Sequence, residues 1–573
     1  MPSITAATVW TVSGMSLVAL MLLGYALFDV GSVQPKNTSG TIVRHLVVTF
    51  ASILGFLFIG FGLFFGGHGG FFGVLDFFTL GNYGPELPEG VPLTLFVAAQ
   101  ALVCAVAANI VCGALAERSN LAANVAVALV IGLLVYPFVN RWTWGAGWLA
   151  QMGFHDFAGS ASLNVVAGVV ALVGTLLVGP RDGKYADGEV HALPGQSLTR
   201  CLEGSLLILV GWFGLMGLSC LVFGVSDVDA FGKAFLGMLA AASVSSLTAI
   251  VLTKARYGGV DVPMALNGLV GGLVAVSSGA DVMNPLVCAL SGVLAGVLVV
   301  LGTEWVERSP RVDDPVGSVV THGACGVLGL LLVGLFGEGG LVFGGVGFFG
   351  VEVLGGVAII AWTALLCWAV LAVVARTADL RVLRSEEVAG LGLSGPSLNN
   401  AFMEYLPELK PAALQDASAR TPDLPVDVAV PLALMGGADE CRLKKVQVIC
   451  RPTRLDDLRR ELSSIGVTGM TVLEVKGCGE QKGARETYRG IPVSVEFVPK
   501  VQVDIVVSKV PVEDVVLAAR RALYTGHIGD GKVFVYGVAE AVKVRTGEHG
   551  DVLNRAVLIV RALTRSPFPG AGR

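Results

Sequence analysis

Two stretches of the sequence share one pattern, and that pattern decides how the rest of the chain is interpreted. DFAGSASLNVVAG (156–168) and DPVGSVVTHGACG (314–326) place Asp, Gly, Ser, a polar residue and Gly at identical spacing. Each stretch opens a long apolar run, and five such runs separate the register points, so the two copies are expected to cross a membrane in opposite directions. An inverted repeat of this kind usually places the substrate site at the repeat interface, near the middle of the membrane.

The composition supports a membrane protein with an attached soluble part. Only 14% of the 573 residues are charged, against about 25% in an average soluble protein, and the mean hydropathy is +0.74. The charged residues are sparse up to about residue 375 and dense after it. This uneven distribution predicts a membrane domain that is followed by a soluble domain.

The apolar runs predict eleven transmembrane helices, arranged as an inverted 5+5 repeat plus one. A spanning helix needs about 20 apolar residues. The candidates lie near 6–30, 43–65, 92–116, 121–140, 158–179, 200–223, 231–253, 263–279, 283–303, 318–336 and 347–375.

Basic residues in the short loops indicate the orientation, because Lys and Arg are enriched in cytoplasmic loops. One set of alternate loops holds most of them, whereas the other set holds only Arg141 and Lys233. The expected result is a multi-pass protein of the cell membrane with its N-terminus outside and its C-terminus in the cytoplasm. The residues of the cytoplasmic set are Lys36, Arg44, Arg118, Arg181, Lys184, Lys254, Arg256, Arg308 and Arg311.

The last third of the chain changes character. Residues 403–442 contain several prolines and a Gly436-Gly437 pair, which is typical of a linker. From residue 443 onward, strand and helix patterns alternate in the order βαββαβ, which predicts an α/β ferredoxin-like domain. The predicted domains are a membrane domain with a cytoplasmic tail (1–402), the linker (403–442), a regulatory domain (443–548) and a C-terminal tail (549–573).

Polar side chains inside apolar helices are costly and are therefore candidates for function. Asn164 and His322 occupy equivalent repeat positions, so both are expected to face one central path. The alternative is a structural hydrogen bond between two helices. Asp156 begins its helix, where a capping role is favoured over a role in lending negative potential to an outer vestibule.

Several motifs in the first 402 residues resemble the Amt/Mep/Rh ammonium transporter family. That resemblance implies a homotrimer with one pore in each subunit, and no enzymatic activity. It also implies an outer ammonium site at Trp144, Ser219 and Asp156, where the cation meets aromatic and hydrogen-bonding groups. The motifs are DFAGS (156–160), GALAER (113–118), GWFG (211–214), RVDDP (311–315) and HGACG (322–326), together with the tail at 378–402.

Three pore positions differ from the pattern that this resemblance implies. Asn164 replaces one of two facing histidines, while Val103 and Leu215 replace the phenylalanines of the outer gate. An asparagine cannot take up a proton as a histidine does. Besides regulated ammonium transport, two alternatives therefore remain open: a non-transporting ammonium receptor, and a channel for another small solute or ion.

Residues 443–548 resemble a PII signal-transduction protein. The resemblance implies ATP or ADP in clefts between the subunits of a trimer, and 2-oxoglutarate bound with Mg-ATP through Gln481 and Lys500. The motifs are TGMT (468–471), GEQKG (479–483), YRG (488–490), FVPK (497–500), TGHIGDGK (525–532) and RTGE (545–548). The implied nucleotide-binding residues are Gly469, Thr471, Gly479, Gln481, Lys500, Gly529, Asp530, Gly531, Lys532, Lys543 and Arg545, with Gln481 also reaching the metal through Mg-ATP.

The long polar loop at 477–492 is expected to carry the contact between the two domains. Arg489 matches the residue that PII proteins insert into the cytoplasmic mouth of a transporter pore, which implies a pore-blocking role. Glu480 stands where an arginine is common and is expected to repel phosphate. Val493 stands where some members carry a modifiable tyrosine. The partners implied are ammonium or ammonia, adenine nucleotides, 2-oxoglutarate and the lipid bilayer, and no nucleic acid.

Overall fold

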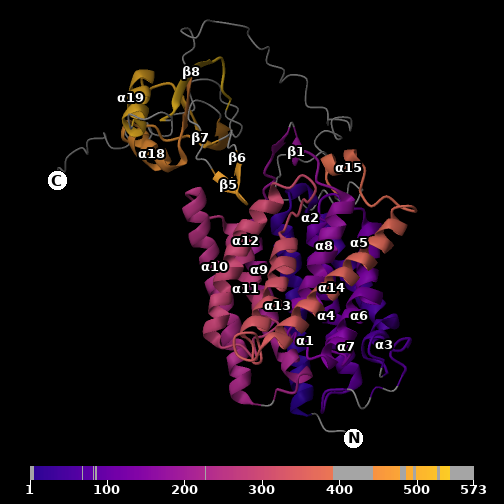
Figure 1. Cartoon of the computed structure of the whole chain (residues 1–573). Helices are drawn as coiled ribbons and strands as arrows, with labels where there is room; N and C mark the ends of the chain where they lie inside the picture. The colour runs from indigo at the N-terminus through magenta and orange to yellow at the C-terminus, as the bar shows by residue number, and fades with distance from the viewer. Residues whose placement is uncertain are drawn as a thin grey trace, which may run out of the picture. The chain divides into compact units, whose positions relative to one another are not determined.

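The protein is described by a computed structural model that covers residues 5–67, 69–81, 83, 87–186, 188–225, 227–391, 443–477, 486–493, 498–524 and 530–542. The chain forms two compact units. The first comprises Met1–Lys410 together with Thr487–Val493, and the second comprises Pro411–Glu486 and Ser494–Arg573. The α-helices of the first unit are labelled in Figure 1.

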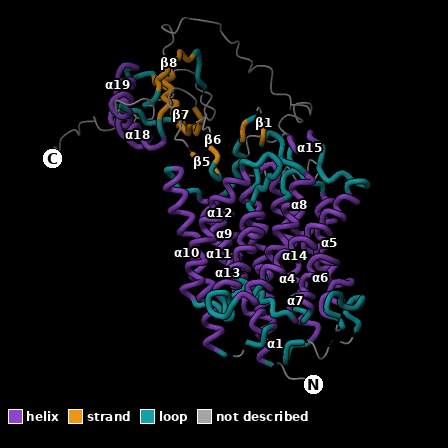
Figure 2. The backbone as a smooth tube through the Cα atoms, in the orientation of Figure 1, coloured by secondary structure: helices purple, strands orange, loops and turns teal. Residues whose placement is uncertain are grey.

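The first unit is a bundle of apolar helices, drawn in purple in Figure 2. Several of its long helices contain a wider π-helical turn, written here as η. The helices are α1 (Ala6–Ser32), α2 (Thr38–Gly55), η2 (Phe56–Gly60), α3 (Phe61–Phe65), α4 (Leu93–Ala114), α5 (Leu121–Val130), η4 (Ile131–Val135), α6 (Tyr136–Trp142), α7 (Trp148–Gln151), η5 (Ser160–Val165), α8 (Val166–Val178), α9 (Leu198–Val222), α10 (Val228–Tyr257), α11 (Val262–Val276), α12 (Pro285–Glu307), η6 (Val319–Ala324), α13 (Cys325–Phe336), α14 (Val346–Val374) and α15 (Arg384–Ala389). A short hairpin, β1 (Tyr185–Ala186) and β2 (Glu189–Val190), follows α8.

Within the described residues, ten helices are long and apolar enough to cross a membrane. The prediction of eleven includes 263–279, where the structure forms the apolar helix α11 over only 15 residues. That length is below the roughly 20 residues of a full crossing. The chain is therefore a helical membrane protein with about ten spanning helices, and the eleventh crossing stays a prediction.

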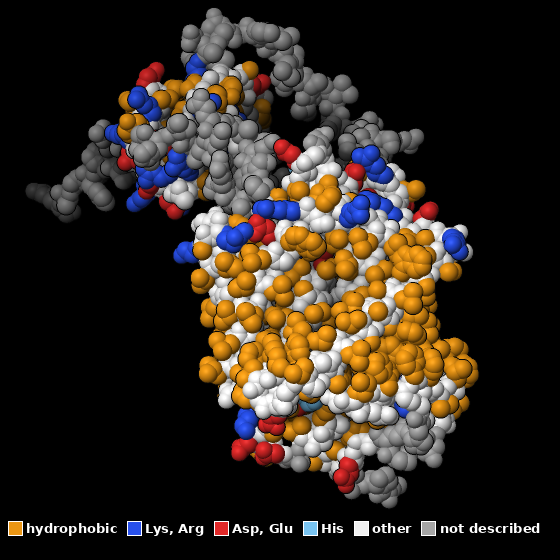
Figure 3. Space-filling model, in the orientation of Figure 1, with side chains coloured by type: hydrophobic (Ala, Val, Ile, Leu, Met, Phe, Trp, Pro, Cys, Tyr) orange, Lys and Arg blue, Asp and Glu red, His pale blue; other side chains and the backbone are white. Residues whose placement is uncertain are grey.

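The surface of the first unit matches a lipid environment. Figure 3 shows apolar side chains around the middle of the bundle, with charged side chains gathered toward its two ends. Large apolar side chains such as Leu54 and Trp305 are 60% and 72% exposed. An apolar surface of this extent is stable only when lipid or another apolar surface covers it.

The two repeat sequences fold into the same local structure. Gly159 and Gly317 both have a positive φ, 84° and 86°, a conformation that favours glycine. Asp156 accepts hydrogen bonds from the backbone nitrogens of Ala161 and Ser162. Asp314 accepts in the same way at the second copy, from residues 316, 317 and 319. Each aspartate therefore caps the π-helical turn that opens its helix, η5 or η6.

The helices of the two repeats cross at glycine. A Cβ added at Gly168 would lie 2.2 Å from the Cα of Gly323, which leaves no room for a side chain. Small residues at such a crossing let two backbones approach closely. Asn164 lies one turn before Gly168 and His322 directly precedes Gly323, so the crossing places these two side chains next to each other.

The second unit is a four-stranded antiparallel sheet with two helices. The elements follow one another as β3 (Leu443–Cys450), α18 (Leu455–Ser464), β4 (Thr471–Gly477), β7 (Val498–Val507), α19 (Val512–Leu523) and β8 (Lys532–Val538), and the strand order is β4-β7-β3-β8. The core packs Val446, Val448, Val503 and Ile505 of the sheet against Leu458, Leu462, Val515 and Ala519 of the helices. After β8, Val542 forms a single bridge, and the residues from 543 onward lie outside the described part of the chain.

The polar stretch predicted as a loop contains a short hairpin. β5 (Glu486–Tyr488) pairs with β6 (Ile491–Val493). Arg489 and Gly490 form the turn with φ values of 52° and 76°, as a tight two-residue hairpin turn requires. A charged residue at the tip of a hairpin is usually exposed to solvent. In this structure, however, the side chain of Arg489 is buried within the first unit.

Candidate functional site

Four predicted residues line one small cavity, here called the Trp144 cavity. Val103 comes from α4, Leu215 and Ser219 come from α9, and Trp144 follows α6. The remaining lining residues are Gln100, Leu218 and Val222, and the volume is about 10 Å³. The structure therefore brings together the residues that the resemblance assigns to an outer site and to a gate.

Asp156 lies beside this cavity but does not line it. Its carboxylate is 1% exposed and is occupied by the cap of η5 and by the hydroxyls of Ser162 and Ser278, at 2.7 and 2.9 Å. Its carbonyl oxygen accepts the indole N–H of Trp144 at 2.6 Å. Asp156 thus positions Trp144 and the start of the helix, which is the capping role favoured by the sequence.

Asn164 and His322 form a direct hydrogen bond. The Nδ2 of Asn164 donates to the carbonyl oxygen of Gly159 at 2.8 Å, so its Oδ1 faces the His322 Nδ1, also at 2.8 Å. An amide oxygen only accepts, and Nδ1 of His322 must therefore carry the proton. In the neutral imidazole this leaves Nε2 as a hydrogen-bond acceptor.

His322 also lines a second cavity of about 20 Å³, here called the His322 cavity. His322 therefore fits both interpretations made from the sequence, because its side chain forms a hydrogen bond to another helix and also lines an internal space. The lining residues are Tyr25, Phe28, Asp29, Ile208, Asn267, Val270, Val316, Ser318, Thr321 and His322. Asn164 is fully buried and does not line either cavity.

Asp29, a buried carboxylate in this cavity, was not predicted from the sequence. The signal was present, because Asp29 lies inside the first apolar run and a carboxylate there is costly. His45, on α2, bonds it at 2.9 Å. The pairing of two residues on different helices could not be read from their separation in sequence.

Arg489 occupies a polar site near the start of η6. Its backbone nitrogen donates to Asp261 at 2.5 Å, and its Nη1 donates to the carbonyl oxygen of Asp314 at 2.7 Å. Nη1 also pairs with Glu307 at 3.1 Å. Arg489 is only 1% exposed. Burial raises the pKa of the Asp261 carboxyl, and the hydrogen bonds from Met264 and Arg489 counteract part of that rise.

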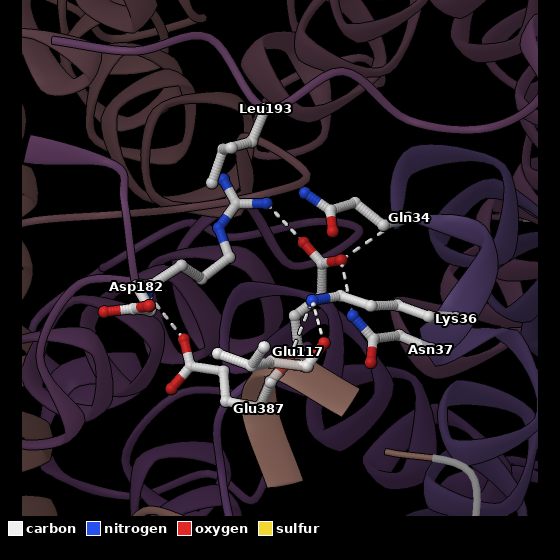
Figure 4. A pocket seen from close by; sticks show the side chains of 9 residues that line it. Gln34, Lys36, Asn37, Glu117, Asp182, Leu193 and Glu387 are labelled. Carbon is white, nitrogen blue, oxygen red and sulfur yellow. Dashed lines mark hydrogen bonds and ion pairs between the residues drawn. The ribbon is translucent and has the colours of Figure 1, made fainter. Parts of the chain in front are cut away.

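A second polar network joins α15 to the loops of the first unit (Figure 4). It surrounds a cavity of about 100 Å³. Glu117 accepts hydrogen bonds from the backbone of Gln34 and the side chain of Asn37, at 2.8 and 2.7 Å. Lys36 donates to the carbonyl oxygens of Glu387 and Val388 at 2.8 and 3.1 Å. The polar groups of this cavity are paired with one another, so the network works as a structural joint.

Arg181 connects this joint to the second repeat. It pairs with Glu117 and forms a two-pronged contact with Asp313 at 2.8 and 2.9 Å. Burial alone raises the pKa of the Asp313 carboxyl, but the charges of Arg181 and Arg118 outweigh it and hold the pKa well below its usual range. The capping Asp314 is the next residue, so the network fixes the position of η6.

In the second unit, part of the predicted nucleotide site converges at one end of the sheet. Lys532 pairs with Ile449, and Val501, next to Lys500, pairs with Cys450. Asp530 lies 3.9 Å from Arg451. A Cβ at Gly531 would lie 2.3 Å from the Ile449 carbonyl oxygen, and its φ is 128°, so this position requires glycine.

The other predicted nucleotide residues are elsewhere or are not described. Thr471 begins the edge strand β4, where it pairs with Asp504 of β7, and Gly469 precedes that strand. One chain therefore does not bring these two residues to the end of the sheet that holds Lys532. Gly479, Gln481, Gly529, Lys543 and Arg545 lie outside the described residues, as do Glu480 and the proposed metal contact through Gln481.

Comparison with known proteins assigns both parts of the chain. Residues 9–395 match the model of the Ammonium Transporter Family. The chain belongs to the ammonium transporter family. Residues 443–548 match the model named Nitrogen regulatory protein P-II, so this transporter-family chain carries a P-II domain.

The relatives of this transporter-family chain include transporters and a sensor. Ammonium transporter Amt2 of Archaeoglobus fulgidus is 30% identical over 69% of the chain and 87% of its own length. Ammonium transporter Amt1 of Haloferax mediterranei is 30% identical over 70% of the chain and 80% of its own. A solved structure named Sensor Amt Protein is 28% identical with a TM-score of 0.63, and it matches over 67% of the chain and 97% of its own length.

Proposed function

We propose that the first unit moves ammonium across the cell membrane and that the P-II domain regulates this movement. The observation that carries the proposal is the His322 cavity, which is lined by a histidine whose Nδ1 is bound to Asn164 and whose Nε2 is left as the acceptor. A neutral imidazole can accept a hydrogen bond from ammonium or ammonia at this point. The Trp144 cavity supplies a second site on the path, with an aromatic ring that attracts a cation.

The finer topology belongs to the same proposal. We infer eleven crossings, with α11 as a short eighth, arranged as an inverted 5+5 repeat plus one. The shared local structure of η5 and η6 supports the repeat. The N-terminus is outside and the C-terminus is cytoplasmic. The domains extend over 1–402, 403–442, 443–548 and 549–573, and the strand order of the P-II domain supports a ferredoxin-like fold.

The P-II domain is proposed to bind ATP or ADP, with Mg-ATP and 2-oxoglutarate together. Lys500 and Lys532 supply positive charge at one end of the sheet, and charged hydrogen-bond donors of this kind hold phosphates. The position of Gly469 and Thr471 on another part of the sheet supports a cleft that needs a neighbouring subunit. The resemblance of both halves to their families implies a homotrimer, in which the symmetry axes can coincide.

Arg489 is proposed to block the pore in one ligand state. It sits beside the second repeat in contact with Asp261, Glu307 and Asp314. A Cβ at Gly317 would lie 3.3 Å from its Nη2 and 2.6 Å from Asn267, which itself lines the His322 cavity. A guanidinium at this point narrows the path and repels cations. We infer that ADP favours this state and that Mg-ATP with 2-oxoglutarate releases it.

Ammonium sensing without transport is the second candidate. Asn164 removes one titratable group from the path, and one of the solved relatives is named a sensor. Flux through the full chain in lipid vesicles separates the two functions. A transporter accumulates ammonium in preference to potassium, and His322→Ala removes that flux. Failure of the wild type to carry ammonium in any ligand state overturns the transport proposal and leaves the sensor.

A further inference from the structure

The His322 cavity has the composition of a cation site. Asp29 places a carboxylate in it and is 2% exposed. Two further side chains that line it, Tyr25 and Thr321, are 4% and 2% exposed, and their hydroxyl oxygens have no hydrogen-bond partner among the residues that the structure describes. Buried polar groups are almost always paired. Two unpaired hydroxyls beside a carboxylate therefore point to a small polar occupant of this cavity.

The size of the cavity restricts that occupant. Its volume is about 20 Å³, and a cavity needs roughly 10–15 Å³ to hold one water molecule. Ammonium is close to water in size. Asn267 and Ser318 also line the space, but each already bonds a backbone carbonyl oxygen. The acceptors left on the other polar lining residues are a carboxylate oxygen of Asp29, the hydroxyls of Tyr25 and Thr321, and Nε2 of His322. Four acceptors match the four N–H groups of one ammonium ion.

The proton of the Asp29–His45 pair can be located from its neighbours. Asn109 donates its Nδ2 to Thr49 and to the Ala105 carbonyl oxygen, both at 2.8 Å. Its Oδ1 therefore faces His45 Nδ1 at 2.6 Å, and Nδ1 must carry a proton. The 2.9 Å contact between His45 Nε2 and Asp29 Oδ2 then needs one further proton between the two groups. The pair is neutral overall and holds one proton that it can give up.

We propose that Asp29, Tyr25, Thr321 and His322 form a site that holds a single ammonium ion, and that the Asp29–His45 pair supplies its proton. Neutral ammonia that reaches the cavity takes the shared proton and becomes ammonium. His45 is left as a neutral imidazole with the proton on Nδ1, and Asp29 is left as the carboxylate that faces the cation. The number of protons is unchanged, and the net charge of the cluster stays at zero.

This site deepens the proposed function and rests on it, because ammonia must reach the cavity. It also gives the chain a second proton carrier where Asn164 cannot act as one. The carrier lies on α1 and α2, whereas Asn164 lies on η5 and His322 lies on η6. The site serves a transporter as a point of reprotonation and serves a sensor as the place where ammonium is retained.

Calorimetric titration of the full chain in detergent with ammonium chloride tests the site, with potassium chloride and methylammonium chloride as comparisons. The wild type is expected to bind ammonium more tightly than either comparison, because methylammonium exceeds the space and potassium has no N–H groups. Asp29→Asn is expected to remove one ammonium per chain. Tyr25→Phe and Thr321→Val each remove one hydrogen bond to a cation and are expected to weaken binding about tenfold or more.

Thr303→Val is the matched control. Thr303 is also 2% exposed and its hydroxyl is also unpaired, but it does not line the cavity. The proposal is overturned if the wild type, Tyr25→Phe and Thr321→Val bind ammonium equally well, and the cavity is then assigned to water. This comparison is valid even if the Asp29→Asn variant does not fold. Vesicle flux measured in parallel keeps the two ideas apart. If the wild type carries ammonium and the variants bind it unchanged, only this ammonium site is rejected. If the wild type carries no ammonium, the transport proposal is rejected.

Discussion

Replacing Arg489 with alanine tests whether the hairpin at 486–493 is held by this single side chain. Arg489 is 1% exposed and bonds Glu307 and the Asp314 carbonyl oxygen at 3.1 and 2.7 Å. Removing one partner of a buried ion pair costs about 3–5 kcal/mol. Glu307 keeps Lys184 as a partner, so the lower end of that range applies. About 3 kcal/mol corresponds to roughly a hundredfold loss in the docking equilibrium.

Thiol labelling of a cysteine introduced at Tyr257 measures that equilibrium. A Cβ at Gly490 would lie 2.8 Å from the Tyr257 hydroxyl, so the docked turn covers this position. The eight cysteines within the described residues are all buried, and Cys441 and Cys478 are replaced by serine to complete a quiet background. With ADP present, labelling is expected to be slow in the parent and about a hundredfold faster in Arg489→Ala.

Arg489→Lys is the matched variant, because it keeps the charge but loses the planar fork. An intermediate labelling rate is expected for it. Equal labelling in the parent, in Arg489→Ala and in a chain that ends at residue 442 refutes the reasoning. That result would mean that Arg489 does not hold the hairpin over Tyr257 and that the P-II domain acts at another place.

Three further predictions address the path, the loop that precedes η5 and the nucleotide site. His322→Ala is expected to abolish selective ammonium flux while the assembly survives, and Asn164→His is expected to speed transport; unchanged flux in both rejects the path. Burial lowers the pKa of His155, but the hydrogen bond and charge of Asp281 at 3.0 Å outweigh it and raise that pKa. The pair therefore stabilises the protein fully below about pH 6.5, and this contribution is lost as the pH rises through the raised pKa of His155. The decrease in Tm caused by His155→Gln should accordingly become smaller between about pH 6 and about pH 9. A Tm difference between wild type and variant that stays constant over this range contradicts the assignment. Lys532→Ala is expected to weaken ATP binding to the full chain about tenfold or more, as measured by calorimetry, since it removes the charged contact to phosphate that we propose for this residue.

The repeat was the part of the fold that the sequence predicted best. Asp156 and Asp314 each stand three residues before a glycine with positive φ, and both cap a helix as the pattern indicates. The reason is that a cap depends on residues within one turn of each other. The same locality made the strands and helices of the P-II domain predictable.

Contacts between distant segments escaped the sequence analysis. Asp29 and His45 lie on different helices, and the three-way contact of Glu117, Arg181 and Asp313 joins three separate loops. Each of these charges looks like an ordinary loop or helix residue until packing brings its partner close. The end of α11 was also predicted too late, because the run was extended through two serines and a glycine to residue 279, whereas the helix ends at Val276.

Ammonium flux into lipid vesicles that contain the full chain, compared between ligand states, tests the central claim most directly. The claim is that the membrane unit conducts ammonium and that Arg489 closes it under control of the P-II domain. With ADP inside, uptake by the wild type is expected to stop, whereas uptake continues in Arg489→Ala. With Mg-ATP and 2-oxoglutarate, both proteins are expected to conduct ammonium in preference to potassium. Identical uptake by the two proteins in both ligand states would contradict the account.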